Sequence, residues 1–146
     1  MESKGFKKIF SEVAKSNGFE SAFGGWFKDS AESIVVLDLQ KSNFGDYYEM
    51  NIKIYIQGMF GNSYSRTKDL VKKDIGDVFT RQPSEYKSVF DFDEPMNSEK
   101  RKTELAKLFS KFIVPFAGKA LSKSGIRELA EKGEIFLLPA VKEELG

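Results

Sequence analysis

The feature that most constrains the fold is a stretch of strict alternation between residues 47 and 57. Every second position is apolar: Tyr48, Met50, Ile52, Ile54 and Ile56. The positions between them carry Tyr47, Glu49, Asn51, Lys53, Tyr55 and Gln57. Successive side chains of a β-strand point to opposite faces, and β-branched residues favour strands. The stretch therefore predicts a strand with one face toward the core and an outer, polar face that carries two tyrosines.

The segments before this strand predict a helix and two further strands. An amphipathic helix is expected over residues 4–17, because one apolar stripe repeats with helical spacing. The stripe consists of Phe6, Ile9, Phe10, Val13 and Ala14. Residues 19–28 are expected to form a hairpin that turns at Gly24 and Gly25. Residues 33–40 predict a central strand that is buried on both faces at one end, because both faces carry apolar side chains there.

The segments after the strand predict short strands and mainly helices. Residues 67–73 predict a short helix, and residues 78–81 and 89–92 predict short strands. A long apolar stripe follows a helix cap at Asn97 or Ser98, and Pro115 is expected to kink or end that helix. Two short helices are expected near the end, one closed by Gly133 and one that begins near Pro139.

This order of elements predicts an α+β fold, with an antiparallel sheet of four to six strands and helices packed on one face. No repeat or linker divides the chain, so residues 1–146 are predicted to form a single domain. One core is expected to join the helices to the sheet. Its predicted members are Phe10, Val13, Trp26, Leu37, Leu39, Ile52, Ile54, Leu108 and Phe112.

Composition excludes several classes of chemistry. The chain contains no cysteine and no histidine, which excludes thiolate nucleophiles, imidazole bases and the metal sites built from either. Only oxygen ligands remain for a metal, and the acidic group Asp91, Asp93 and Glu94 is better explained as a solvated strand end. We therefore predict no catalytic residue, no cofactor and no metal site.

Charge and hydropathy limit the partners and the location. The net charge is +1, and neither half of the chain is strongly basic, which argues against nucleic acid as the main partner. No apolar run approaches the roughly 20 residues of a membrane span, and no apolar signal segment follows the first residues. The lack of cysteine fits a reducing compartment. The expected location is the cytoplasm, without contact to a membrane.

The outer face of the strand at residues 47–57 is the candidate contact surface. Tyrosine there adds apolar area with a polar tip and is enriched in interface hot spots. The candidate residues are Gln40, Lys41, Tyr47, Asn51, Tyr55 and Arg81. The alternative is that the two tyrosines only fill cross-strand pairs on a half-covered sheet.

Two functions remain open on this evidence. The first is a non-catalytic module that docks a protein partner, for instance an immunity-type protein that blocks a toxin. The second is a small-ligand-binding protein, or a hydrolase that uses carboxylate, tyrosine and lysine side chains. A flat face would favour the first function, and a deep pocket lined by Gln40, Asn51 and Arg81 would favour the second.

Several short segments in order resemble an uncharacterised bacterial family called domain of unknown function 4304. The segments lie at residues 17–19, 39–42, 48–52, 76–83 and 112–116, and the resemblance extends over roughly residues 5–145. It implies the same α+β fold, and it carries over no catalytic residue.

Overall fold

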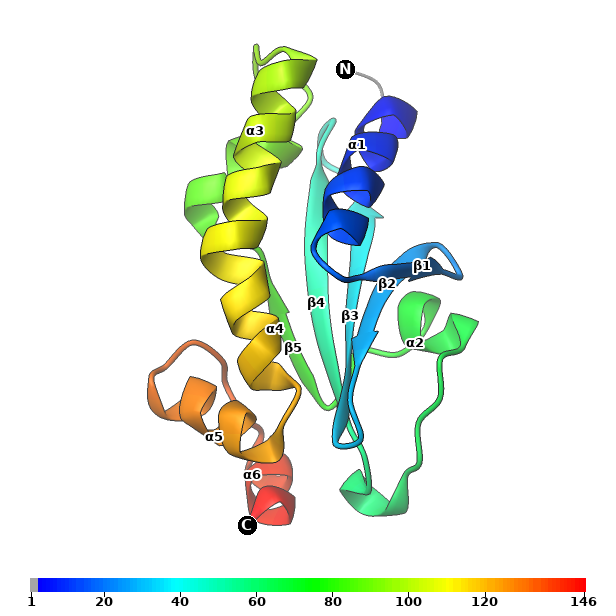
Figure 1. Ribbon diagram of the computed structural model, residues 1–146, viewed down its shortest axis with the longest axis vertical. Helices are drawn as coiled ribbons and strands as arrows, with labels where there is room; N and C mark the ends of the chain where they lie inside the picture. The colour runs from blue at the N-terminus through cyan, green and yellow to red at the C-terminus, as the bar shows by residue number, and fades with distance from the viewer. Residues whose placement is uncertain (1–2) are drawn as a thin grey trace.

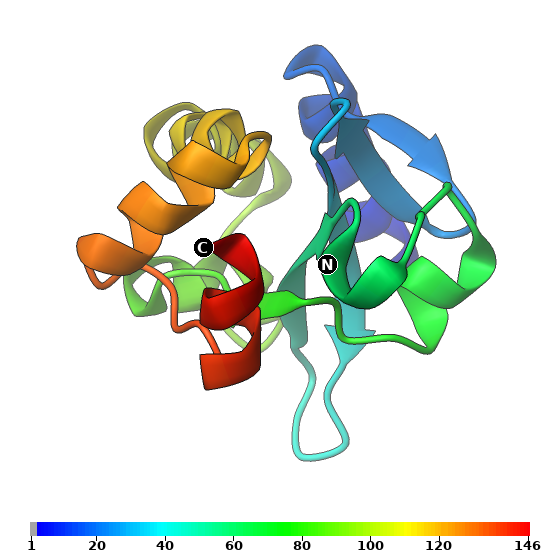
Figure 2. The same ribbon diagram turned by 90° about the horizontal axis from the view of Figure 1, so that it is seen from below.

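A five-stranded antiparallel sheet forms the centre of the computed structural model, which describes residues 3–146 (Figure 1). The strands lie across the sheet in chain order: β1 (Glu20–Ala22), β2 (Gly25–Asp29), β3 (Ser33–Lys41), β4 (Tyr48–Ile56) and β5 (Val78–Arg81). The longest pairing joins β3 to β4, from Ser33 opposite Ile56 to Lys41 opposite Tyr48. The hairpin that they form projects beyond the rest of the molecule (Figure 2). The strand predicted from the alternating stretch is confirmed as β4.

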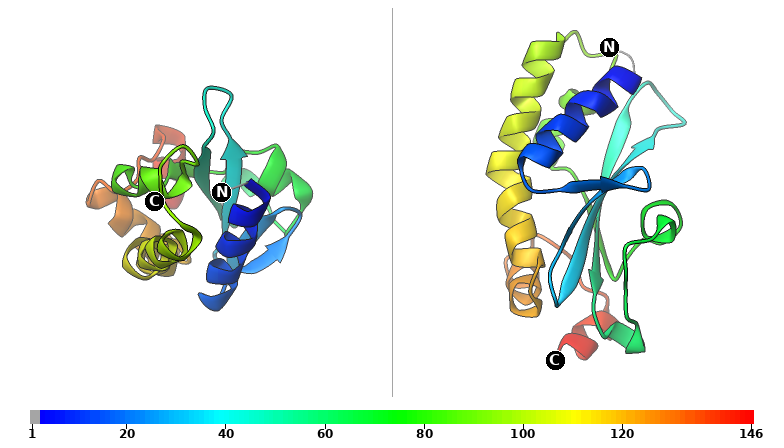
Figure 3. Two further views of the ribbon diagram at one scale, coloured as in Figure 1. Left: turned by 90° about the horizontal axis from the view of Figure 1, so that it is seen from above. Right: turned by 45° about the vertical axis from the view of Figure 1, so that its right-hand side comes forward.

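Most of the helices lie on one side of this sheet, which we call its first face, as the right-hand view of Figure 3 shows. They are α1 (Ser3–Ser16), α3 (Ser98–Leu108), a π-helical turn (Phe109–Ile113), α4 (Val114–Ala120), α5 (Lys123–Glu131) and α6 (Pro139–Leu145). Together with the antiparallel sheet they confirm the predicted α+β fold. No helix in the described part of the chain is long and apolar enough to cross a membrane.

The main core lies between these helices and the first face of the sheet. Of its predicted members, seven are buried there: Phe10, Val13, Trp26, Leu37, Ile52, Ile54 and Leu108. Leu39 and Phe112 are half-buried and pack against the same cluster. Aromatic contacts join the layers, because the Phe10 ring lies 4.6 Å from the Trp26 ring and 5.5 Å from the Phe109 ring, centroid to centroid.

The second face of the sheet is covered by the short helix α2 (Lys68–Lys72) and the chain that leads to it, which includes a 3₁₀ turn (Met59–Gly61). A second, smaller apolar cluster forms there from Phe27, Ile34, Val36, Tyr55, Leu70 and Val71. It confirms that β3 is buried on both faces. It also corrects the prediction that the polar outer face of β4 is open for contact along its length, since Asn51 and Lys53 are each 5% exposed and Tyr55 is 1% exposed.

The first hairpin turns one residue earlier than predicted. Phe23 and Gly24 both adopt left-handed backbone angles, with φ of 54° and 80°, and Gly25 is already the first residue of β2. Two consecutive left-handed residues suit the twist of a tight hairpin. A Cβ atom on Gly25 would lie 2.9 Å from Cγ2 of Val71, so glycine also allows the close approach of α2.

Two other elements differ from their predictions. Residues 89–92 do not form a strand: a 3₁₀ helix covers Ser84–Phe90, and Asp91 makes only an isolated bridge to Tyr47. Pro115 does not end its helix, because the chain passes from α3 through the π-helical turn into α4 as one continuous rod (Figure 1). Pro115 lies in the first turn of α4, which begins directly after the π-helical turn. A proline donates no backbone hydrogen bond, and the wider i→i+5 hydrogen-bond pattern of the π-helical turn accommodates it.

Candidate functional site

A polar groove lies on the second face of the sheet, between the end of α2 and the strands β3, β4 and β5. We call it the α2 groove, and its volume is about 500 Å³. Its lining residues are Asp38, Leu39, Gln40, Asn51, Lys53, Val71, Lys72, Lys73, Asp74, Ile75, Phe79 and Arg81. The groove is therefore assembled from three strands, from the end of α2 and from the segment that follows it.

Hydrogen bonds between side chains cross the strands at the floor of the groove. Asn51 is paired in register with Asp38 on β3 and with Arg81 on β5. Its amide nitrogen donates to Asp38 Oδ1 at 3.2 Å and to Gln40 Oε1 at 3.0 Å, and its oxygen accepts from Arg81 Nε at 3.0 Å. Asn51 therefore fixes the positions of its neighbours on both sides.

Lys53 and Tyr55 attach α2 to the sheet through the carbonyl groups of the helix. Lys53 Nζ donates to the carbonyl oxygen of Val71 at 2.8 Å, and the Tyr55 hydroxyl donates to that of Leu70 at 2.7 Å. These carbonyls belong to the last turn of α2, where helix geometry leaves acceptors unpaired. Burial raises the pKa of Tyr55 well above its usual 10.0, with smaller contributions from nearby acidic groups such as Asp74.

The structure brings five of the six predicted contact residues to one surface. Gln40, Asn51 and Arg81 line the α2 groove. Gln40 and Arg81 also line an adjoining hollow of about 250 Å³ beneath the β3–β4 hairpin, together with Lys41 and Tyr47.

Tyr55 is the exception among the predicted contact residues. It lies beneath α2 and is 1% exposed, because the loop after β4 folds back over its side chain. Its assignment to a contact surface is therefore wrong for this structure.

Several residues of this surface did not stand out in the sequence. Lys72, Lys73, Asp74 and Ile75 reach the groove from the segment that ends α2. Phe44 lies at the turn of the β3–β4 hairpin, is 95% exposed and lines the adjoining hollow. The one sequence signal for Phe44 is that a large apolar residue stands among the turn-forming residues at positions 42–46.

The lining of the α2 groove consists of charged, amide and apolar side chains. It contains no hydroxyl side chain, and the carboxylate at its floor, Asp38, is paired with the Lys53 ammonium at 3.1 Å. The other charged side chains at the α2 side of the groove are Lys72, Lys73 and Asp74, and all three are exposed. No group of three or more acidic side chains in residues 3–146 is placed to hold a metal ion.

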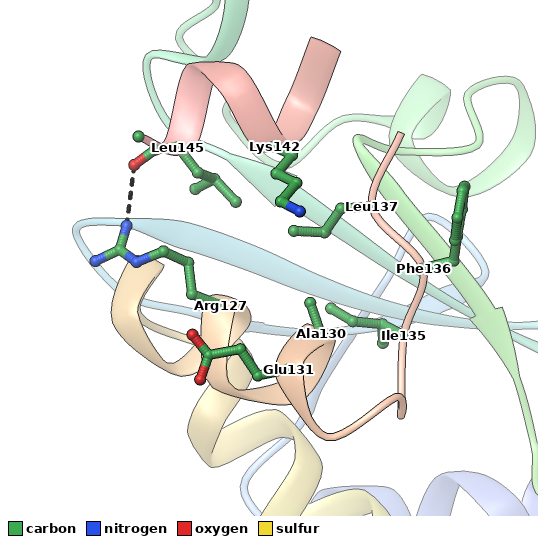
Figure 4. Close-up of a pocket in the computed structure, with 9 residues that line it drawn as sticks. Arg127, Ala130, Glu131, Ile135, Phe136, Leu137, Lys142 and Leu145 are labelled. Carbon is green, nitrogen blue, oxygen red and sulfur yellow. Dashed lines mark hydrogen bonds between the residues drawn. The ribbon is translucent and has the colours of Figure 1, made fainter. Parts of the chain in front are cut away.

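A second hollow of about 430 Å³ lies between α5 and α6 (Figure 4). Its walls include Ala130, Ile135 and Leu137, and Arg127 closes one side by donating to the carbonyl oxygen of Leu145 at 3.0 Å. None of the residues selected from the sequence lines this C-terminal cleft. The α2 groove differs in that Gln40, Asn51 and Arg81 of the predicted contact surface line it.

A family model for a domain of unknown function, DUF4304, matches residues 10–119. The chain belongs to this family. The DUF4304 match includes the whole α2 groove and leaves out the C-terminal cleft, which is built from residues 127–146. Neither a curated protein nor a solved structure matches the chain.

Proposed function

We propose that the protein is a non-catalytic binding module that docks a protein partner on the second face of its sheet. The observation that carries this proposal is a fixed polar floor bordered by exposed apolar side chains. Phe44 is 95% exposed, Ile75 68% and Phe79 38%, and they line the α2 groove or the adjoining hollow. Protein interfaces combine such anchors with oriented polar groups, and a few aromatic or arginine side chains dominate their energy.

A small-ligand-binding protein is the second candidate function. The volume of the α2 groove falls within the range of about 300–1,000 Å³ that is typical of small-molecule sites. Its lining by Gln40, Asn51 and Arg81 is the arrangement that favours this alternative. A hydrolase receives less support, because the groove holds no hydroxyl nucleophile.

We further propose that the module acts in the cytoplasm of a bacterium, where an immunity-type role would make the partner a toxin. The family resemblance supports a bacterial source. A chain without cysteine fits a reducing compartment.

Affinity capture from the native host, read by mass spectrometry, tests the docking proposal. Phe44→Ser and Phe79→Ser alter the proposed face, while Phe136→Ser is a matched control, since Phe136 is 76% exposed and lines the C-terminal cleft. We expect the first two variants to lose a partner that the wild type and the control retain, with unchanged melting temperatures. Capture that is lost only in the control would contradict the proposal.

The small-ligand alternative predicts a different result. A metabolite mixture from the same host would raise the melting temperature of the wild type in the absence of any protein partner. Arg81→Ala would abolish that increase, because Arg81 borders both hollows.

A further inference from the structure

The carboxylate at the floor of the α2 groove is already paired within the protein. Asp38 is only 8% exposed, and its Oδ1 accepts from Asn51. Its Oδ2 makes no hydrogen bond within residues 3–146, although it forms an ion pair with Lys53. The ammonium of Lys53 therefore compensates this oxygen, and the Asp38 carboxylate adds no free negative charge to the groove.

The charges around the groove favour an acidic ligand. Asp38 and Lys53 offset each other as an ion pair, which leaves Lys72, Lys73 and Arg81 against the single carboxylate of Asp74. None of these three cations forms an ion pair within residues 3–146. The guanidinium of Arg81 is held over the Phe79 ring at 5.5 Å and by its bond to Asn51. One cation is therefore oriented in advance, and two more lie on the flexible side chains of adjacent lysines.

The shape of the groove favours an extended segment over a compact molecule. Its floor is buried, but Ile75, at 68% exposure, and Phe79, at 38%, leave an apolar border open to solvent. The adjoining hollow continues the surface as far as the hairpin, because Gln40 and Arg81 line both. A chain of several residues can cover the floor, the border and the adjoining hollow together.

We propose that an acidic segment of the partner protein occupies the α2 groove. Its carboxylates face Lys72, Lys73 and Arg81. The proposal rests on the docking function above and specifies which chemistry of the partner is recognised.

Short synthetic peptides in which Glu alternates with Ser or Gly are the probe, with Gln-for-Glu peptides as the uncharged control. Amide NMR spectra of the full chain report where they bind. We expect shifts to concentrate at residues 38–40, 51–53 and 72–75, and to weaken as salt is added. Lys72→Gln combined with Lys73→Gln should weaken binding about two- to thirty-fold, since exposed ion pairs contribute roughly 0.2–1 kcal/mol each. Both lysines are exposed, so the fold should be unaffected.

Arg81→Gln tests the oriented cation. It removes the guanidinium that Phe79 and Asn51 hold in place, so binding should weaken even though Lys72 and Lys73 are intact. Equal binding of the Glu and Gln peptides, or wild-type affinity in both protein variants, would overturn the proposal. Ribose 5-phosphate provides a further arm: if it shifts the groove signals and the acidic peptides do not, the small-ligand alternative replaces the acidic segment.

Partner capture and peptide binding together distinguish the acidic-segment proposal from the docking proposal. Capture that depends on Phe44 and Phe79 without any binding of acidic peptides would overturn only the acidic segment. Loss of both results would overturn both proposals.

Discussion

Lys53 Nζ lies 3.1 Å from Asp38 Oδ2 on the second face of the sheet, and the two side chains are only 6% and 11% exposed. The residues come from neighbouring strands and are diagonal to each other, because Asn51 is the residue opposite Asp38. Lys53 also donates to the carbonyl oxygen of Val71. One ammonium group thus links β3, β4 and α2, and it does so at the floor of the candidate site.

Loss of the Lys53 ammonium should destabilise the protein strongly. Removing one partner of a buried pair leaves the other charge uncompensated, so we expect Lys53→Met to lower the free energy of unfolding by about 3–5 kcal/mol. The double variant with Asp38→Leu should recover part of this loss, because it removes the stranded carboxylate as well. Urea unfolding of both variants is the measurement, and a single variant within about 1 kcal/mol of wild type would contradict the coupling.

Tyr55 should make the stability depend on pH in the alkaline range. Burial raises the pKa of Tyr55 above 10.0 in the folded chain, whereas the unfolded chain releases the proton near that ordinary value. The unfolded state therefore binds fewer protons above about pH 10, and stability falls as the pH rises through that value toward the folded pKa. Below about pH 10 the contribution is fully present.

The comparison variant for this effect is Tyr55→Phe. It should lose about 0.5–1.5 kcal/mol at neutral pH, because the hydrogen bond to Leu70 is gone. Its stability should then fall less steeply than that of the wild type above about pH 10. Parallel stability curves for the two proteins would show that the hydroxyl does not titrate differently on unfolding.

The sheet was predictable from the sequence because its signals are local. Alternation identified β4, two apolar faces identified β3, and the short connection between them fixed the register that places Gln40 near Asn51. Arg81 joins them because β5 pairs with the other edge of β4. The position of α2 was not predictable. It has five residues and buries only Leu70 and Val71, too few for a periodic pattern that shows where it packs. The burial of Tyr55 depends on that packing, and so does the position of Lys72 and Lys73 at the groove.

Leu37 and Leu39 should differ in their effect on stability, although both belong to the predicted core. Leu37 is fully buried between the sheet and the helices, whereas Leu39 is half-buried near the end of β3. We expect Leu37→Ala to cost about 2–5 kcal/mol and Leu39→Ala clearly less, because a partly exposed site leaves a smaller cavity. Chemical unfolding measures the free energy of unfolding of both variants, and equal losses of stability would contradict the difference in burial between the two leucines.

Arg101 should hold the segment before α3 in place. It is fully buried, and its guanidinium donates to the carbonyl oxygens of Val89, Asp91 and Glu94 at 2.8–2.9 Å. Arg101→Met would leave these acceptors without their donor, at a cost of about 3 kcal/mol or more. Hydrogen exchange of the amides at residues 89–94 should accelerate in this variant. Arg101→Lys keeps the charge but not the fork of donors, so its exchange rates should lie between those of Arg101→Met and wild type.

The two tyrosines of the predicted contact surface should differ in how their replacement affects stability and partner capture. Tyr55 packs beneath α2 with its ring 5.1 Å from that of Tyr64, so Tyr55→Ser should cost about 3–5 kcal/mol and its effect on partner capture would report only unfolding. Tyr47 is half-buried beside the hairpin and lines the hollow that adjoins the α2 groove. Tyr47→Ser should therefore change stability by less than about 1 kcal/mol.

Partner capture by the Tyr47→Ser variant is the informative result, because its fold stays intact. If the docking face includes the adjoining hollow, capture should fall while the melting temperature stays near that of the wild type. Undiminished capture by the folded Tyr47→Ser variant would remove the hairpin side from the docking face and confine any contact to the α2 groove. A melting temperature that drops as far as in Tyr55→Ser would instead show that Tyr47 supports the fold, through its backbone bridge to Asp91 and its contact with the ammonium of Lys87.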